Sequence, residues 1–318
     1  IYVATTTGKI FKFVDTGAAL ALPAGGNWAT SFSSATVLSI TSPLSFDAAN
    51  LYFGGTNAAA DPRVFAVQIA SGAGEKTLVK NIDGPPSAVR TAPSTMDNGG
   101  STYLMIGSDA AASQAHIYRV DIGGGTLNAD NTGPLHHVKA PTFTFGRVHV
   151  GDDGGRMHAI NGDDFSAPLF ENLVGWPYRD TTNHTVPNLD AGLYPIRGAA
   201  FMHPFTGNVV YGDGDGHLYV IQTAGTAMGT YPVALETSAI VGAADGFGGV
   251  IVVGNSNGKI YFLDQQNGGT YGTIFKAYDL GTGVVISDIG FDVTSNKYVV
   301  GTSTGKLLYL PTETDPSP

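Results

Sequence analysis

An apolar run, a short polar turn and a second, alternating apolar run recur along this chain. The clearest copy has an apolar strand at residues 250–254, a four-residue polar turn at 255–258 and the alternating residues 259–264. β-branched side chains favour strands, while Asn, Ser and Gly supply the backbone conformations that tight turns need. The pattern therefore predicts a β-hairpin at each place where it occurs.

Seven copies of this hairpin pattern follow one another. Their first strands end at Ala4, Gly54, Gly107, Gly151, Gly212, Gly254 and Gly301, so the spacings are 50, 53, 44, 61, 42 and 47 residues. Repeats of roughly 40–50 residues made only of strands are typical of β-propeller blades. We expect an all-β, seven-bladed β-propeller, nearly free of helix. It would form a single domain at residues 1–310, followed by a Pro-rich tail or linker at 311–318.

Both ends of the repeat array are expected to be incomplete blades. The first copy begins at its second strand, and the last copy ends at its third, where the prolines of residues 311–318 make a further strand unfavourable. Exposed strand edges attract other chains. An upstream segment of the same precursor could cover them, which ordinary propeller closure favours, or a neighbouring molecule could donate a strand. Because the chain starts at Ile1 rather than Met, we interpret it as a processed or excised segment.

Composition narrows the class of protein. The net charge of −10 argues against a nucleic-acid partner. The absence of Cys excludes disulfides, thiol catalysis, Cys-ligated zinc and covalent haem attachment. No stretch is long and apolar enough for a membrane span. Charged residues make up only 13%, and this low charge, with no Cys and many Ser, Thr and Gly, favours an exported prokaryotic protein.

The repeat also resembles a known family. The repeat pattern consists of a Ser-Pro opening, Val-x-Val-Gly, a polar turn and Lys-Ile-Tyr-x-Leu-Asp. This pattern resembles the quinoprotein-like (PQQ-type) propeller repeat, most clearly at residues 147–161. That stretch is also similar to the repeat of pilus-tip adhesin propellers. Quinoprotein dehydrogenases usually carry eight blades, regular Trp docking motifs and often a vicinal Cys pair, whereas this chain has only Trp28 and Trp176 and no Cys. The resemblance implies the fold, and we expect no PQQ, no haem and no dehydrogenase activity.

Two of the polar turns contain pairs of carboxylates. Asp152 and Asp153 lie in one turn, and Asp213 and Asp215 lie in the next. Spaced carboxylates beside Gly can bind Ca²⁺, which takes several oxygen ligands, but neither turn has the distal Glu of a full calcium loop. Asp and Gly are also ordinary turn residues because they tolerate positive φ. We favour turn chemistry and retain Ca²⁺ as the only expected metal.

The longest spacing contains a segment rich in aromatic and basic residues. Long loops on rigid scaffolds often carry function. This loop suits either a ligand or protein contact, or a plug that covers the channel mouth, and both interpretations stay open. Its binding candidates are Trp176, Tyr178, Arg179, His184, Tyr194 and Arg197.

Three basic residues precede or open inner strands. Arg90, Lys139 and Arg197 could converge at the channel mouth and attract an anion, but scattered, solvated charge is the interpretation that we favour.

The leading functional hypothesis is a non-catalytic extracellular or cell-surface module for interaction or structure. It could belong to a larger surface protein or filament assembly, with a protein partner, self-assembly or a surface glycan as its ligand. One alternative is a polysaccharide-acting lyase or hydrolase, whose site at the channel mouth would use Arg197, His184 and Tyr178. Another is a periplasmic scaffold resembling the propeller lipoprotein of outer-membrane assembly. Linear spacing identifies no Ser-His-Asp set or catalytic carboxylate pair.

Overall fold

The computed structural model describes twelve stretches of the chain. They are residues 1–16, 20–85, 88–98, 100–107, 117–129, 141–144, 146–161, 176, 178–179, 195–203, 206–265 and 271–312. Within them the one helical element is a 3-10 turn at Asn27–Ala29. None of the described residues forms a helix with the length and apolar character needed to cross a bilayer.

The chain divides into two compact units, and each is described by itself. The first holds Ile1–Phe143 and Gly162–Phe170, and the second holds Thr144–Asn161 and Glu171–Pro318. The strands of the first unit are β1 (Tyr2–Ala4), β2 (Ile10–Lys12), β3 (Val14–Asp15), β4 (Leu20–Ala21), β5 (Val37–Ile40), β6 (Ser45–Phe46), β7 (Asn50–Asn57), β8 (Pro62–Gln68), β9 (Leu78–Asp83), β10 (Ser94–Asn98), β11 (Ser101–Gly107), β12 (Ile117–Asp121) and β13 (Thr126–Ala129).

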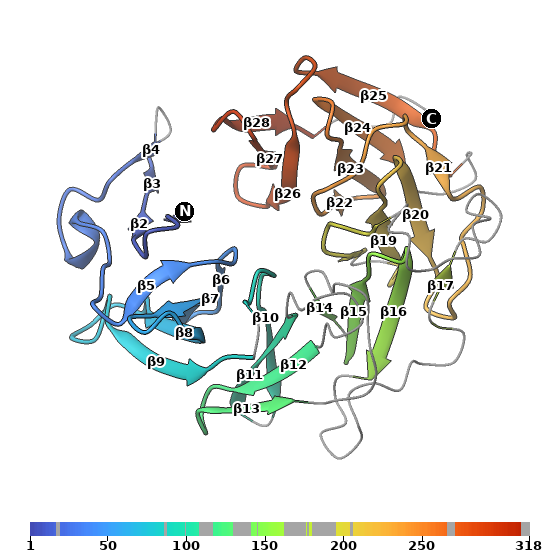
Figure 1. Cartoon of the computed structure of the whole chain (residues 1–318). Coiled ribbons are helices and arrows are strands. Elements are labelled where there is room, and N and C mark those ends of the chain that lie inside the picture. The colour runs from blue at the N-terminus through green and yellow to red at the C-terminus, as the bar shows by residue number, and fades with distance from the viewer. Residues whose placement is uncertain are drawn as a thin grey trace. The chain divides into compact units, whose positions relative to one another are not determined.

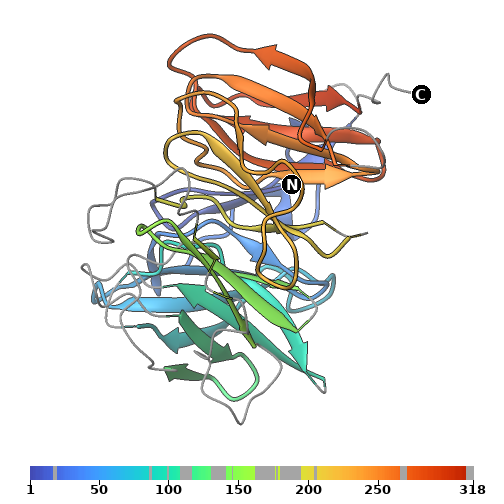
Figure 2. The same ribbon diagram turned by 90° about the vertical axis from the view of Figure 1, so that its right-hand side faces the viewer.

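The second unit continues in the same manner. Strand β14 (Thr142–Thr144) contains the boundary between the units. The strands that follow are β15 (Arg147–Gly151), β16 (Arg156–Asn161), β17 (Tyr178–Arg179), β18 (Phe201–Met202), β19 (Val209–Gly212), β20 (His217–Ile221), β21 (Val233–Ala234), β22 (Asp245–Phe247), β23 (Val250–Gly254), β24 (Lys259–Asp264), β25 (Ile274–Asp279), β26 (Ile286–Asp292), β27 (Lys297–Thr302) and β28 (Leu307–Pro311). Figures 1 and 2 show the later sheets following one another in chain order.

The fold is an all-β propeller arrangement of antiparallel sheets, and the seven predicted hairpins are all present. They are β1–β2, β7–β8, β11–β12, β15–β16, β19–β20, β23–β24 and β27–β28. The predicted count of seven blades is wrong, because a hairpin alone is not a blade. Among the described residues, five sheets have four strands or more, β26–β28 form a three-stranded sheet, and β1–β2 form a two-stranded one. The incomplete sheets are those of the first and last hairpins.

One inner strand also differs from expectation. From the second copy onward, a short stretch opened by small residues or Pro precedes each hairpin, and this pattern predicts an inner strand at residues 238–242. The observed strand is β22 (Asp245–Phe247). Ile240 is buried and packs on the preceding sheet instead. Small and apolar residues at 238–242 therefore mark a packing contact rather than a strand.

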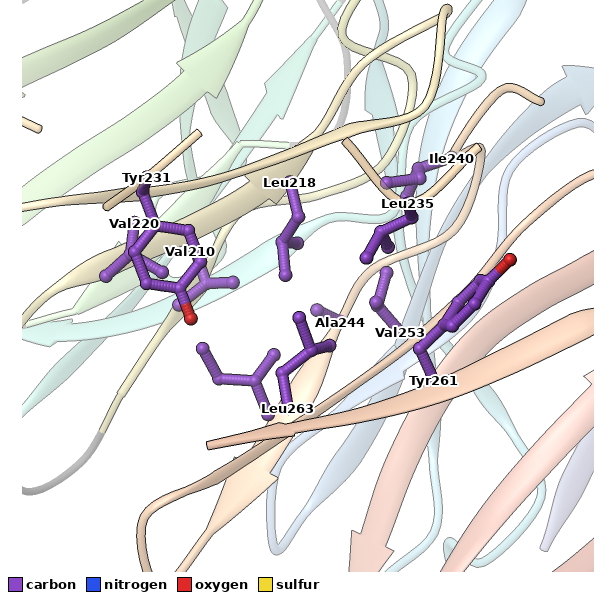
Figure 3. Close-up of a cluster of buried hydrophobic side chains, with 11 residues drawn as sticks. Val210, Leu218, Val220, Tyr231, Leu235, Ile240, Ala244, Val253, Tyr261 and Leu263 are labelled. Carbon is purple, nitrogen blue, oxygen red and sulfur yellow. The ribbon is translucent and has the colours of Figure 1, made fainter. Parts of the chain in front are cut away.

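The central strands explain why the chain alternates as it does. In β23, Ile251 and Val253 enter a core shared with the preceding sheet β18–β21 (Figure 3), while Val250 and Val252 enter a core shared with β26–β28. Successive side chains of a strand point to opposite faces, and both faces are covered here. The continuous apolar runs of the sequence thus reflect strands buried on both sides.

A glycine closes the first strand of the hairpin because the next sheet approaches it closely. A Cβ atom at Gly254 would overlap the side chain of Ile286, which is the first residue of the following inner strand β26 and pairs with Thr302 of β27. Gly54 with Val89, Gly151 with Ile196, and Gly212 with Ile240 repeat this contact. The Val-x-Val-Gly motif is therefore a packing requirement between neighbouring sheets.

We expect Gly254→Ala to lower the free energy of unfolding by about 2–3 kcal/mol, because the added methyl group overpacks a well-filled contact. Gly290→Ala in β26 is the matched control, since no atom lies within 4 Å of the Cβ that it would add. That control should change stability by less than about 1 kcal/mol, in the stabilising direction. Urea unfolding of the three proteins measures the difference. Equal losses in both variants would contradict the packing explanation.

One buried histidine lies among apolar neighbours in the second unit. His149 on β15 is 1% exposed, and its ring lies edge-on to Trp176 with 5.6 Å between the ring centroids. Neither ring nitrogen has a hydrogen-bond partner among the described residues. Burial, with a smaller contribution from the charge of Arg147, lowers the pKa of His149 to about 4.

Because of the lowered pKa of His149, we expect the folded protein to lose stability in acid. As the pH falls from 6.5 towards 4, the unfolded chain takes up a proton that the folded protein excludes, so the native state loses up to about 3 kcal/mol. Above pH 6.5 both states are neutral at this residue and it contributes no pH dependence. His149→Phe keeps a ring beside Trp176 but cannot titrate, so it should gain on the wild type as the pH falls. Parallel stability curves between neutral pH and pH 4 would refute this.

Candidate functional site

Five of the hairpins share one turn, which we name the repeat turn and number by its positions 1 to 5. The N–H of position 1 donates to the carbonyl oxygen of position 5, and the N–H of position 5 donates to the side-chain oxygen of position 1. Position 4 is a glycine with positive φ. The turns are residues 5–9, 152–156, 213–217, 255–259 and 302–306. Asp152 and Asp213 each accept the position-5 N–H with a side-chain oxygen, and neither is among the residues with positive φ.

The carboxylate of Asp152 is held by cationic and imidazole groups. Its Oδ2 atom accepts from Arg156 Nε at 2.9 Å and lies 3.1 Å from His158 Nε2. Burial favours the neutral acid, but the hydrogen bond with His158 and the charges of His158 and Arg156 outweigh it and lower the pKa of Asp152. A metal ion at Asp152 would have to displace the guanidinium group. Asp153, which follows, is half-buried.

The carboxylate of Asp213 has a different environment. His217 Nδ1 lies 2.9 Å from Asp215 Oδ1 and 3.9 Å from Asp213 Oδ2. Burial, followed by the hydrogen bond and charge of Asp215, raises the pKa of Asp213 to about 7. Of all groups of three or more acidic, His or Cys side chains in the described residues, this is the one whose donor atoms lie close enough to hold a metal ion.

Neighbouring groups fix Asp213 in place. The N–H groups of Asp215 and His217 donate to its Oδ1 atom at 3.2 and 2.9 Å, and the hydroxyl of Tyr219 donates to Oδ2 at 2.9 Å. The ring of Tyr219 stacks on Tyr211 with 4.8 Å between centroids. The two carboxylates are predicted from the sequence pattern, whereas His217 and Tyr219 are not. The sequence contains a pattern that could have identified them, because four polar residues occur at every second position: Asp213, Asp215, His217 and Tyr219.

The second candidate surface is the outer edge of the last sheet. In the five larger sheets, strands β8, β12, β16, β20 and β24 each pair with a further outer strand, β9, β13, β17, β21 and β25 respectively. The equivalent strand of the last sheet is β28, which among the described strands pairs only with β27. Thr302 and Lys306 are hydrogen-bonded to each other. Hydrogen-bonded and non-hydrogen-bonded pairs alternate along antiparallel strands, so the backbone N–H and C=O of the next residue, Leu307, point away from β27. The Leu307 side chain is 41% exposed.

The structure describes only part of the predicted aromatic and basic loop. Trp176 is 7% exposed, and its Nε1 atom donates to the carbonyl oxygen of Thr223 at 3.3 Å. Tyr178 is half-buried in β17 and lies edge-on to Tyr219, with 6.2 Å between centroids. Trp176 thus contributes to the core of the second unit. Arg179 is described only by its backbone in β17, and His184 and Tyr194 lie outside the described residues.

Of the three basic residues predicted near the inner strands, the structure describes two. Arg90 is exposed in the first unit, and Arg197 is exposed in the second. Lys139 lies outside the described residues. An anion site formed by these residues stays a prediction.

Comparisons with known proteins support the fold. No protein-family model and no curated protein matches the sequence. The crystal structure of the computationally designed protein Ika8 is similar with a TM-score of 0.64 and 18% identity, covering 98% of this chain and 80% of that one. Sqt1 of Saccharomyces cerevisiae is similar with a TM-score of 0.64 and 16% identity, covering 98% and 81%. These likenesses concern the fold alone, and the chain is an all-β protein with the sheet arrangement of a propeller.

Proposed function

We propose that this chain is a non-catalytic interaction module that accepts an extended segment of another protein as a further strand beside β28. The observation that carries the proposal is the unequal size of the sheets. Five strands equivalent to β28 pair with an outer strand, whereas β28 pairs only with β27 among the described strands. Strand addition satisfies backbone donors and acceptors along such an edge and needs no deep pocket.

The expected partner segment has the chemistry of the outer strands that this chain already contains. Strand β25 pairs with β24 along residues 274–279 and combines aromatic and aliphatic residues with Lys276 and Asp279. A partner segment with a similar mixture of apolar and charged residues fits the edge. Pro311 is the last residue of β28 and has no N–H, so it cannot donate a backbone hydrogen bond to a partner strand at that end.

We also propose that the module works outside the cell or at its surface, with the periplasm as the alternative compartment. The low content of charged residues and the absence of Cys support this proposal. A role in adhesion or in filament assembly would use the same edge, because a strand donated by each molecule to the next links them into a polymer.

A labelled peptide with the sequence of residues 273–280 tests the edge. We expect the wild-type protein to bind it in a fluorescence anisotropy titration. Leu307→Pro removes an outward-facing N–H and should weaken binding at least tenfold, or about 1.4 kcal/mol. Leu307→Thr keeps the N–H and is the matched control, which should bind within a few-fold of the wild type.

Three outcomes would overturn the proposal. They are no binding by the wild type, equal binding by the Leu307→Pro protein, or turnover of polysaccharides that is lost in Arg197→Ala. Sedimentation of the wild type without peptide distinguishes the sources of the strand. Concentration-dependent dimers that Leu307→Pro abolishes would identify a second copy of the chain as the donor.

A further inference from the structure

The repeat turn at residues 213–217 places three metal-binding groups within reach of one ion. The donor atoms of Asp213, Asp215 and His217 all lie within 4.8 Å of one another. Ligands held at about 2.0–2.2 Å from a zinc ion are separated from each other by roughly 3–4 Å. The separations of 2.9 Å and 3.9 Å from His217 Nδ1 to the two carboxylates agree with that requirement.

The other repeat turns provide an internal comparison, because their backbone hydrogen bonds are the same. Side chains at positions 1 and 3 meet in this geometry, as shown by the Oγ1 atoms of Thr5 and Thr7 and by those of Thr302 and Thr304, each pair 3.0 Å apart. In the turn at 213–217 both of these positions carry a carboxylate, so that two acidic groups are brought together.

Position 5 distinguishes the turn again. It is Lys9, Arg156, Lys259 or Lys306 in the other four turns and His217 in this one. Lys and Arg bring a fixed positive charge to the turn, whereas imidazole is a neutral metal ligand at physiological pH. The two carboxylates therefore lie beside a ligand at the position where the other turns have a cation.

The turn is held rigidly from both sides. The N–H of Ile240 donates to the carbonyl oxygen of Asp213 at 2.9 Å, and the N–H of Leu235 donates to that of Gly216 at 3.0 Å. The hydroxyl of Tyr219 holds Asp213 Oδ2 in place. Groups that orient a ligand in this way raise metal affinity, because little conformational freedom is lost on binding.

We propose that Asp213, Asp215 and His217 form a binding site for one first-row divalent transition-metal ion, with Zn²⁺ as its representative. The imidazole decides the class of ion, since Ca²⁺ and Mg²⁺ take oxygen ligands whereas Zn²⁺ and its neighbours accept nitrogen and oxygen together. The side chains of Asp215 and His217 are 34% and 19% exposed, so solvent or a group from a partner can complete the coordination.

Equilibrium dialysis against Zn²⁺ at neutral pH, with metal analysis of the protein, tests the site. We expect one zinc ion per chain and a rise in the midpoint of thermal unfolding that excess chelator reverses. His217→Lys and Asp215→Asn introduce the residues that the turn at 255–259 carries at the same positions, so both variants should fold. Each variant removes a direct ligand. Mutation of residues that only hydrogen-bond to metal ligands typically weakens metal binding roughly 10–100-fold, so these two variants should weaken zinc binding by more than that.

Lys306→His is the matched control, because it places a histidine at position 5 of a turn that has Thr302 and Thr304 instead of carboxylates. It should bind no second zinc ion. The proposal is overturned if the wild type binds no zinc, if either folded variant keeps the wild-type affinity, or if Lys306→His gains a site of equal strength. Circular dichroism of each variant shows whether it is folded, and His217→Lys decides the question if Asp215→Asn does not fold.

Discussion

The close contact between a glycine at the end of one strand and a branched side chain of the next sheet sets the spacing of the structure. Gly254 and Ile286 show it, and Gly212 and Ile240 repeat it one sheet earlier. A side chain at either glycine would push neighbouring sheets apart and open the apolar cores on both sides. The repeat of the sequence is thus a repeat of an interface as much as of a hairpin.

In the repeat turns, positions 1 and 4 determine the backbone conformation, whereas positions 3 and 5 determine the chemistry. A side-chain oxygen at position 1 and a glycine at position 4 are sufficient to build the turn, whether position 1 is Thr, Asn or Asp. Positions 3 and 5 can then vary. At Asp152 the variation produces a buried ion pair with Arg156, and at Asp213 it produces a group of metal ligands.

Much of the fold could be predicted from the sequence, because hairpin signals are local. Alternation and turn residues located all seven hairpins and indicated that the first and last would belong to incomplete sheets. They did not distinguish a hairpin from a complete blade, so the predicted count of seven blades was wrong. Ile240 shows the same limit, because an apolar residue in a predicted strand packs on Gly212 instead. The carboxylates of the site were visible in the sequence. His217 was missed because only the turn geometry brings its ring to Asp213 and Asp215.

Strands β19 and β23 each give alternate residues to two cores, as β23 does with Ile251 on one side and Val252 on the other. These cores are therefore shared between sheets, and in the second unit the sheets β18–β21 and β22–β25 each depend on both of their neighbours. Stability in such an array is a sum of similar nearest-neighbour terms. Because four junctions use the same glycine contact, duplication of one of these repeats in the gene would insert a sheet whose two faces already match those on either side. The architecture can grow or shrink by whole repeats without inventing a new interface.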